Sequence, residues 1–505
     1  MPRTFQWSFF FAGAVALTAG TAFGQVTAVF CNIQGVSTSQ VPGLPGFTFT
    51  PGPNVPDVFR RPYNSQNGSY WVITARVSTS LGGPFRVVIV GGGTPTPVVI
   101  ARQGATAPFD AARAWAEFDE QVTVNENGRI AFTASVSGNS ADNIVVAQYN
   151  VDQFVNLPFR EGRQVPTIAG ATFGPTLDSA AISESGSIAC RSLITGGGSN
   201  TTNNQILALP TAIIARTGVT SPVGLTAKWE NFDVGTFFYR SNGAYLIRGD
   251  LDSAVNADEI LGFANLVTVR EGSVIAGLNS PVTVRGIQGV AFGQDPSYLA
   301  RGQNTLASED WVVRNGALIA RANGFITPNN PTAERFVSST AAVTTFFAVG
   351  ANGAGDYLVG GFTNVGNADR DEVLVWNGDR VAIREGDRID INADGTPDNA
   401  FVGSFRKDAC IVKAGRSGVV YATVEVKDSR GNVIGYAYVC TPVTNTCTGD
   451  FNGDGFVDGF DYDDFVSCFE APANCPPDVS ADVNGDGFVD GFDYDEFVAA
   501  FELGC

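Results

Sequence analysis

The sequence contains no histidine in its 505 residues. Catalytic arrangements of the Ser-His-Asp and Cys-His types are therefore excluded, and transition-metal sites, which rely largely on imidazole ligands, are disfavoured. Basic residues are also few, because 31 Lys and Arg stand against 50 Asp and Glu. Nucleic-acid binding requires a basic surface, which this composition does not supply. Chemistry based on carboxylate pairs, tyrosine, lysine or arginine remains open.

Long apolar runs are missing beyond the N-terminus. No stretch reaches 18 apolar residues, so we expect no membrane-spanning helix. Residues 1–24 have the layout of a secretory signal, with Arg3, an apolar run over 9–17, and the small residues Ala22 and Gly24 before an expected cleavage at Gln25. We therefore expect a secreted or cell-surface protein that is not integral to a membrane.

The acidic charge is concentrated at the C-terminus. Residues 447–505 contain fifteen Asp and Glu and no Lys or Arg, whereas residues 1–446 are close to neutral. Within this acidic segment one twelve-residue phrase occurs twice, at 450–461 and at 482–493. In both copies oxygen-bearing side chains occupy positions 1, 3, 5, 9 and 12, and glycine occupies position 6. This is the spacing of an EF-hand-type calcium loop.

The two loops predict two calcium ions. Position 7 contributes only its backbone carbonyl, so a phenylalanine is tolerated there. Position 12 is Asp in place of the usual Glu, which makes the site tighter. The expected ligands are Asp450, Asn452, Asp454, Phe456, Asp458 and Asp461 in the first loop, and Asp482, Asn484, Asp486, Phe488, Asp490 and Asp493 in the second.

An apolar-striped helix is expected after each loop, over 460–469 and over 492–501, and no helix precedes the first loop. This paired loop-helix arrangement, with the closing Gly504-Cys505, resembles a dockerin of the GC type (type I-like). The resemblance implies a domain at 447–505, joined by a linker at 441–446, that docks to a protein partner of cohesin-like role.

One departure from the dockerin pattern concerns the partner. Phe460 and Phe492 stand where familiar dockerins present small polar residues to the cohesin. Both rings lie off the apolar stripe of their helices, which favours exposure and a docking role. The alternative is that they are the first core residues of each helix.

All eight cysteines follow the expected cleavage point, and export permits disulfides. The candidate pairs are Cys468–Cys475, Cys447–Cys505 and Cys31–Cys440, with Cys440–Cys447 as the alternative to the last. Cys190 and Cys410 fall in different repeats, so we expect two buried free thiols.

The body of the chain is repetitive. Six glycine turns followed by an apolar strand, which contains an aromatic residue in all but the Gly186 copy, recur about every 60 residues, at Gly68, Gly128, Gly186, Gly243, Gly353 and Gly418. The interval between Gly243 and Gly353 is about twice as long as the others, and it contains a seventh copy at 297–302. A second marker, an apolar strand ending in Arg-x-Gly or a close variant, recurs at Arg102, Arg160, Arg216, Arg270, Arg321 and Arg384. Repetition at one position predicts a scaffold role for these arginines.

Each copy contains about four short strands, which predicts a mainly β, seven-bladed propeller-like domain over 25–440. The isolated strand at 26–33 is expected to complete the last blade beside 433–440. A β-solenoid or two β-sandwiches are the rival folds. The repeat resembles secreted bacterial proteins built on tandem Asn-x-x-Gly-x-x-Ala-Phe units, best matched by residues 125–132.

Two further patterns have alternative interpretations. The segment 390–398 has oxygens at four calcium-loop positions, but Phe401 at position 12 is no ligand, so an Asx-rich turn is favoured over a partial calcium site. The tryptophans are expected to pack between blades, with sugar stacking as the alternative; they are Trp71, Trp115, Trp229, Trp311 and Trp376.

Two functions follow from these patterns. In the first, the propeller binds a glycan or a protein and the dockerin anchors the chain to a partner or a cell-surface assembly. In the second, the chain is a polysaccharide-degrading enzyme, a carboxylate-based glycoside hydrolase or lyase of the kind that dockerins accompany. No catalytic residue stands out, so the binding function is favoured.

Overall fold

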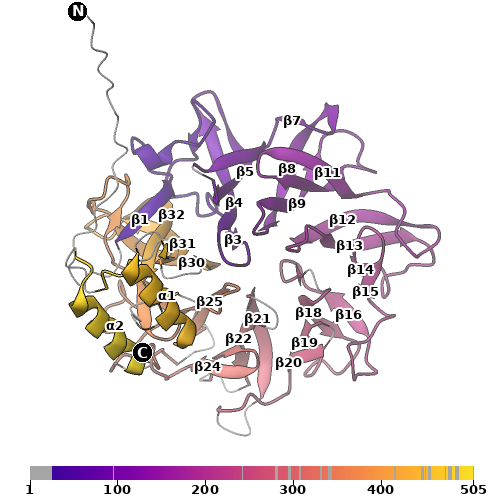
Figure 1. Cartoon of the computed structure of the whole chain (residues 1–505). Helices are drawn as coiled ribbons and strands as arrows, with labels where there is room; N and C mark the ends of the chain where they lie inside the picture. The colour runs from indigo at the N-terminus through magenta and orange to yellow at the C-terminus, as the bar shows by residue number, and fades with distance from the viewer. Residues whose placement is uncertain are drawn as a thin grey trace, which may run out of the picture.

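The computed structural model describes most of the chain. The described residues are 25–94, 96–240, 243–264, 266–278, 283–293, 297–305, 309–329, 332–338, 344–413, 417–444, 449, 451–452, 457–471, 474–475, 480–483 and 488–503. They form seven mainly antiparallel sheets around a central axis, followed by two C-terminal helices (Figure 1). The predicted seven-bladed propeller is confirmed over the solenoid and the paired sandwiches. The expected signal segment lies outside the described residues.

Every blade is a short sheet of mainly antiparallel strands. The strands of blades one to three are β2 (Thr48–Phe49), β3 (Tyr63–Asn64), β4 (Tyr70–Thr79), β5 (Gly82–Gly92) and β6 (Val98–Arg102); β7 (Thr106–Ala107), β8 (Asp110–Val124), β9 (Arg129–Val136), β10 (Ile144–Asn150) and β11 (Gln153–Arg160); and β12 (Ala171–Ile182), β13 (Ile188–Gly196), β14 (Gln205–Ala208) and β15 (Ile213–Arg216).

Blades four to six repeat this order. Their strands are β16 (Trp229–Phe232), β17 (Phe238–Tyr239), β18 (Tyr245–Leu251), β19 (Glu259–Phe263) and β20 (Leu266–Arg270); β21 (Val284–Phe292), β22 (Tyr298–Asn304), β23 (Trp311–Arg314) and β24 (Ala317–Arg321); and β25 (Phe346–Ala351), β26 (Tyr357–Phe362), β27 (Glu372–Trp376) and β28 (Arg380–Arg384).

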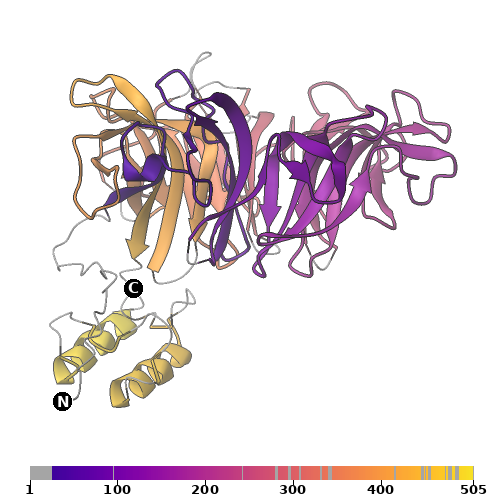
Figure 2. The same cartoon turned by 90° about the horizontal axis from the view of Figure 1, so that it is seen from above.

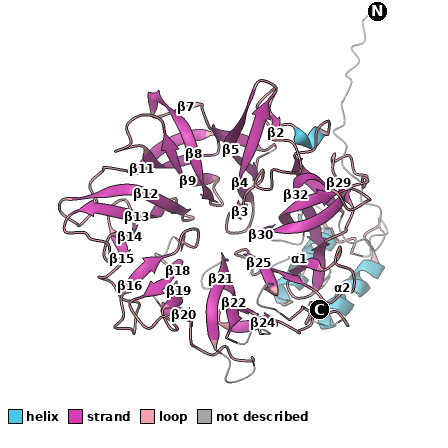
Figure 3. Cartoon of the chain, turned by 180° about the vertical axis from the view of Figure 1, so that it is seen from behind, coloured by secondary structure: helices cyan, strands magenta, loops and turns pink. Residues whose placement is uncertain are grey.

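The seventh blade joins the two ends of the propeller. It contains β30 (Phe401–Lys413), β31 (Ser417–Lys427), β32 (Val433–Thr444), β1 (Val26–Cys31) and β29 (Ile389–Asp390), with β1 antiparallel to β32. Figure 3 shows the ring of strands closed at this blade. The predicted closure by the N-terminal strand is therefore confirmed.

Two details of this blade differ from expectation. The segment 441–444, expected as linker, extends β32, because β31 is long enough to pair with it as far as Thr444. The ladder between β1 and β32 begins with Thr27 opposite Cys440, so Pro442 lies beyond it and removes no N–H from that ladder.

The expected disulfide between Cys31 and Cys440 is wrong, and both thiols are free. The register of the ladder is the reason, because Cys440 lies opposite Thr27 and Cys31 lies opposite Ala437. Since Cys440 is free, the alternative pair with Cys447 does not form either. Cys190 and Cys410 are buried free thiols, as predicted.

The repeated sequence markers have clear structural roles. Asn125 ends the first strand of blade two, and its Oδ1 accepts hydrogen bonds from the backbone N–H groups of Asn127 (3.1 Å) and Arg129 (2.9 Å). Its Nδ2 donates to the carbonyl of Ser183 in the next blade at 2.9 Å. Gly128 completes the turn with φ of 69°, a conformation that glycine adopts without strain.

The Arg-x-Gly arginines cap loops, as their scaffold interpretation predicted. Four of the six, Arg160, Arg216, Arg270 and Arg384, donate from the outermost strand to a carbonyl in the loop that precedes the neighbouring strand, whereas Arg102 donates to the carbonyl of Gln103. Arg160 Nε reaches the carbonyl of Asp142 at 3.1 Å, and Arg216 Nε reaches that of Asn203 at 2.7 Å.

The core consists of apolar layers between neighbouring blades. One layer combines Val146 of the second blade with Phe173 and Ile206 of the third, and others repeat the pattern around the ring. The five tryptophans of the body are buried in these layers, which confirms packing in place of sugar stacking.

A polar contact also joins consecutive blades. A side chain at or just before the strand that pairs with the outermost strand of one blade accepts a hydrogen bond from a backbone N–H in or just before the inner strand of the next blade. The pairs are Gln205 with Phe232 (3.1 Å), Glu259 with Ile287 (2.7 Å), Asp310 with Thr345 (2.7 Å) and Glu372 with Phe405 (2.7 Å). We call these four contacts the interblade acceptors.

The C-terminal helices are α1 (Gly459–Glu470) and α2 (Gly491–Leu503), close to the predicted ranges. They lie off one face of the propeller (Figure 2). In the described part of the chain, neither these helices nor any other is long and apolar enough to span a membrane.

The interblade acceptors predict a pH-dependent stability. Burial raises the pKa of Glu372 to about 7, and the nearby charge of Glu385 adds to this rise. A folded-state pKa above the unfolded value stabilises the fold at low pH, and this stabilisation is lost as the pH rises through about 7. We expect Glu372→Gln to be more stable than the native protein at about pH 8, by on the order of 1–3 kcal/mol.

Urea unfolding followed by near-ultraviolet circular dichroism at about pH 5 and about pH 8 measures this difference. Gln keeps the hydrogen-bond acceptor, and Gln205 already fills the equivalent position in blade three. An unchanged pH dependence in Glu372→Gln would contradict the assignment of the titration to this carboxyl.

Candidate functional site

The inner strands surround a central channel whose two ends differ. At the end where the inner strands finish, residues 64–67 cross the axis and close the channel. Gln66 accepts a hydrogen bond from Arg240 of blade four at 2.9 Å, and Asn64 donates to the carbonyl of Val412 in blade seven at 3.2 Å. The chamber enclosed here has a volume of about 70 Å³, space for only a few water molecules. We call this the closed end.

At the other end the channel opens into a cavity of about 510 Å³, which lies within the range of small-molecule sites. Five blades contribute to it, so its shape depends on the whole ring. Its lining is Arg61, Tyr63, Asp119, Glu120, Gln121, Val234, Gly235, Thr236, Arg248, Gln288, Gly289, Val290, Arg406, Lys407 and Asp408. We call this cavity the mouth.

Bulges in the inner strands present these side chains to the mouth. The pairing of β8 with β9 shifts between Phe118 and Val122, and that of β30 with β31 shifts between Phe405 and Cys410. β21 shifts between Ile287 and Gly289. Bulges re-aim side chains and are common beside active sites. Residues 119–121, 288 and 406–409 therefore leave the regular alternation at one level of the channel.

Asp408 is held in a strained position at this bulge. Its φ is 53°, the left-handed region that few non-glycine residues adopt. Its carboxylate accepts two hydrogen bonds from Arg301 of blade five, at 3.1 and 2.7 Å, and Arg301 is fully buried. Such bidentate pairs are strong and directional, so this one fixes blade seven against blade five across the mouth.

The arginines that line the mouth are committed to protein acceptors. Arg61 donates to the carbonyl of Val290 at 3.1 Å, and Arg406 pairs with Glu120 at 2.9 Å. Lys407 is different, because it is exposed and no hydrogen bond or ion pair joins it to the described residues. It is therefore the mouth cation that is available to a ligand.

Two carboxyl groups in the mouth have contrasting environments. Asp119 accepts hydrogen bonds from the backbone N–H groups of Glu120 (2.7 Å) and Ser179 (3.3 Å), yet burial raises its pKa. Glu120 is 46% exposed at its side chain and faces Arg406. A desolvated carboxyl beside a solvent-accessible one that is paired with an arginine is an arrangement found in acid-base sites.

Asp178 of blade three adds a second buried carboxyl next to Asp119. Burial raises its pKa to about 6, although Arg191 forms an ion pair with it at 2.5 Å. Desolvation thus outweighs the favourable charge contact. The charge of Asp119 contributes to the same rise, so the two carboxyls influence each other.

Comparisons with known proteins were made for the whole chain. A model of DUF7453, a family of unknown function, matches residues 40–243. No curated protein matches the sequence.

Several solved structures are distantly similar. A mutant of puromycin hydrolase has a TM-score of 0.38 and 10% identity. The match covers 75% of this chain and 54% of that protein. A subtype N11 neuraminidase-like protein of A/flat-faced bat/Peru has a TM-score of 0.28 and 11% identity over 84% of this chain and 97% of its own. A GH43 β-1,3-galactosidase has a TM-score of 0.24 and 10% identity over 75% and 94%. At these values none of them informs the function of this chain.

The mouth residues were not found by sequence reasoning. Asp119 and Glu120 directly precede the inner-strand segment 121–124. Two adjacent acids inside a strand are the one sequence signal that could have pointed to them. Lys407 and Asp408 carry no such signal, because the bulge that exposes them is set by pairing with β31.

The expected calcium loops are described in part. Asp461 and Asp493, the last ligand positions, are fully buried at the start of α1 and α2. Asp461 accepts hydrogen bonds from the N–H groups of Asn452 and Asp458, both at 2.9 Å, and Asp493 accepts one from Asp490 at 2.8 Å. The two loops therefore share one geometry at this position.

The remaining calcium positions give no complete ligand set. Asp482, Phe488 and Asp490 are described, and no group of three His, Cys, Asp or Glu gathers within the described residues. The other expected ligands, Asp450, Asp454, Phe456, Asn484 and Asp486, lie outside them. Two buried carboxylates in a segment without Lys or Arg nonetheless fit a cation site, because a buried anion needs compensation.

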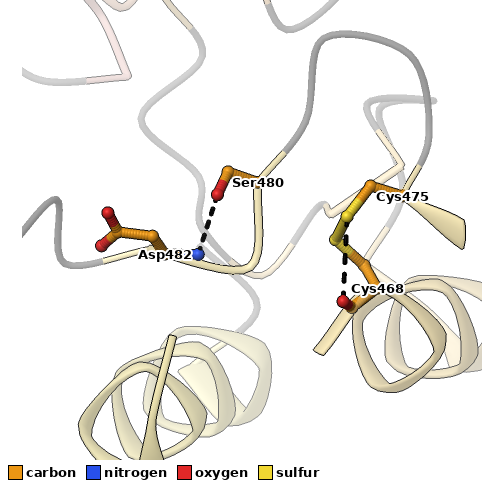
Figure 4. Close-up of a disulfide and its surroundings, with 4 residues drawn as sticks. All are labelled: Cys468, Cys475, Ser480 and Asp482. Carbon is orange, nitrogen blue, oxygen red and sulfur yellow. Dashed lines mark hydrogen bonds between the residues drawn. A yellow bond between two sulfur atoms is a disulfide. The ribbon is translucent and has the colours of Figure 1, made fainter. Parts of the chain in front are cut away.

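The helices pack through equivalent residues. The rings of Phe465 and Phe497 stack with centroids 4.0 Å apart, and the hydroxyls of Tyr462 and Tyr494 lie 2.9 Å apart. The predicted disulfide between Cys468 and Cys475 is present (Figure 4). Cys447 and Cys505 lie outside the described residues.

The exposure expected for Phe460 and Phe492 is confirmed. Phe460 is 71% exposed and Phe492 is 73% exposed, and Phe488 adds a third ring at 72%.

The segment 390–398 is an Asx-rich turn, as favoured. Asp390 accepts hydrogen bonds from the N–H groups of Asp394 and Gly395.

Proposed function

We propose that this protein is an exported glycan-binding propeller, anchored to a protein partner by a C-terminal calcium-binding module of the dockerin type. The observation that supports ligand binding is the mouth, a polar cavity built by five blades around strained, bulged strands. Strain and bulges concentrate at functional sites, because packing alone gives no reason to retain them.

The chemistry of the mouth favours a hydroxyl-rich ligand. Its lining combines carboxylates, amides, a hydroxyl and backbone groups from several directions, as orientation of a sugar requires. Its arginines are already paired with protein acceptors, so their positions are fixed before a ligand arrives. Lys407 and Glu120 supply the accessible donor and acceptor.

The direction of the chain supports an anchoring role for the C-terminal module. β30 runs from the mouth to the closed end, and β32 lies parallel to it because both pair antiparallel with β31. The chain therefore leaves the propeller at the closed end, on the face where the helices lie (Figure 2). A partner bound there leaves the mouth open.

An enzymatic function is the second candidate, and one observation favours it. Asp119, whose pKa is raised by burial, lies beside the more exposed Glu120, and two carboxyls in contrasting environments are the arrangement that carboxylate-based glycosidases use. A carboxylate-based glycosidase or lyase of this kind needs no histidine, in keeping with the composition.

The ligand test compares Lys407→Ala with Lys413→Ala, its match at the closed end of the same strand. On arrays and by calorimetry with plant and algal glycans, we expect Lys407→Ala and Glu120→Gln to weaken binding about fivefold or more, as loss of a hydrogen bond does. Lys413→Ala should bind as the native protein does. Equal loss in all three variants would reject the mouth as the site.

The enzymatic candidate is tested by sugar release from the same glycans. Asp119→Asn keeps the shape of the side chain and removes its proton. Product formation by the native protein that is abolished in Asp119→Asn would replace the binding function by the enzymatic one. If the native protein binds these glycans and releases no product, the enzymatic function is excluded for the glycans tested.

Calcium binding is tested on the full chain. We expect two ions per molecule by calorimetry, and a loss of helical circular dichroism in chelator, because clustered carboxylates repel one another without a cation. Asp461→Asn and Asp493→Asn should each remove one ion. Zero or one ion in the native protein would refute the two-loop assignment.

The docking role of the exposed rings is tested by the double substitution Phe460→Ser and Phe492→Ser. Because both rings lie on the surface, we expect calcium affinity to remain within about twofold while retention on the partner or cell surface falls about tenfold or more. Loss of calcium-dependent folding in the double variant would instead make these rings structural.

A further inference from the structure

A second cavity, separate from the mouth, lies at the outer rim of the propeller. It is bounded by β28 of blade six, residues 326, 327, 332 and 334 before that blade, the start of β1, and a loop of blade seven. Its volume is about 640 Å³, which is the size of a small-molecule site. It shares no lining residue with the mouth.

One wall of this rim cavity is aliphatic. Val26, Ile326, Val381 and Ala382 form it, from three different elements. Convergence of several elements on an apolar wall with a few polar groups is typical of sites that orient a small molecule. The polar side chains of the lining are four arginines, the carboxyls of Glu334, Asp379 and Asp387, two threonines and Gln25.

Three of these arginines have protein acceptors. Arg384 pairs with both carboxylate oxygens of Glu334 at 2.8 Å, and Arg370 pairs with Asp387 at 3.4 Å. Arg388 donates to backbone carbonyls of the blade-seven loop. Each of these three arginines therefore has at least one acceptor within the protein.

Arg380 is the exception. Its Nε and Nη2 are removed from water, and neither has a hydrogen-bond acceptor among the described residues. The guanidinium lies over the ring of Trp376, 4.8 Å from its centroid. Nearby, Gln25 Nε2 is likewise buried without an acceptor. An arginine does not escape this cost by losing its proton, so three donors at one cavity lack a complementary group.

The identity of the two unsatisfied nitrogens indicates what is missing. Nε and Nη2 form the edge of a guanidinium that binds a carboxylate side-on through two parallel hydrogen bonds. We propose that the rim cavity binds a sugar acid of the hexuronate class, with its carboxylate on this edge of Arg380 and its ring against Val26, Ile326 and Ala382.

Binding requires a change in the Arg380 side chain. Because its two nitrogens are covered while the guanidinium rests on Trp376, the side chain turns from the indole toward the cavity when the carboxylate arrives. The ligand thereby replaces a cation-aromatic contact by a bidentate ion pair. Departure of a cation from an indole ring changes the fluorescence of that tryptophan, so Trp376 reports binding.

The test titrates the full chain, with calcium present, with glucuronate and with glucose, which differ only at the carboxylate carbon. We expect a saturable change in tryptophan fluorescence with glucuronate and none with glucose. Arg380→Gln should weaken glucuronate binding about tenfold or more, as loss of a charge-assisted pair does. Trp376→Phe should abolish the fluorescence change while calorimetry still detects binding.

Arg370→Gln is the matched control. It removes one positive charge from the same cavity but not the unsatisfied edge, so binding should fall less than about threefold. Lys407→Ala in the mouth should have no effect, which separates this site from the proposed mouth site. Circular dichroism of each variant verifies folding, and a misfolded Arg380→Gln is replaced by Arg380→Lys, which keeps the charge and loses the bidentate edge.

Three results would overturn the proposal. They are no glucuronate binding by the native protein, equal binding of glucose, and native-like binding by folded Arg380→Gln and Arg380→Lys. Equal affinity for inorganic phosphate would identify a general anion site and reject the sugar-acid assignment.

Discussion

The ladder between β1 and β32 is the contact on which the propeller depends. It joins Thr27 to Cys440 and so brings together segments at the two ends of the domain. Closing so long a loop costs conformational entropy that only the completed ring recovers. Each blade packs against two neighbours, so an open seventh blade would expose apolar layers on both sides of the gap. The N-terminal strand has only six residues, but its pairing with β32 stabilises the whole ring.

Within the closed ring, the interblade acceptors satisfy backbone N–H groups that the bulges leave unpaired. A bulge leaves backbone N–H groups unpaired, and the acceptor from the preceding blade satisfies one of them, as Glu372 does for Phe405. Glu372 and Glu259 bear a desolvation cost that raises the pKa of each to about 7. The same shifts in register carry polar side chains to the mouth, so the feature that fastens the blades also builds the candidate site.

The two ends of the channel divide the molecule into a binding face and an attachment face. Residues 64–67 close one end through contacts with distant blades, and the polypeptide leaves on that side. The mouth, with Lys407 and Glu120 accessible, opens on the other side. This polarity allows a ligand and an anchoring partner to bind at once. The rim cavity adds a third surface, supported by the unsatisfied edge of Arg380.

Sequence periodicity determined the number of blades and the strand order within each, because local turn chemistry and alternating burial are carried by every repeat in its own residues. The closure by residues 26–33 was expected because the seventh repeat lacks one strand, and the disulfide Cys468–Cys475 because the two cysteines lie close in the sequence. The pairing of Cys31 with Cys440 failed because register is set by the whole ladder, and one step along a strand turns a side chain to the other face. The mouth was decided only by tertiary structure. Asp119, Asp408 and Lys407 come from distant blades, and bulges without a sequence signature bring them to one cavity.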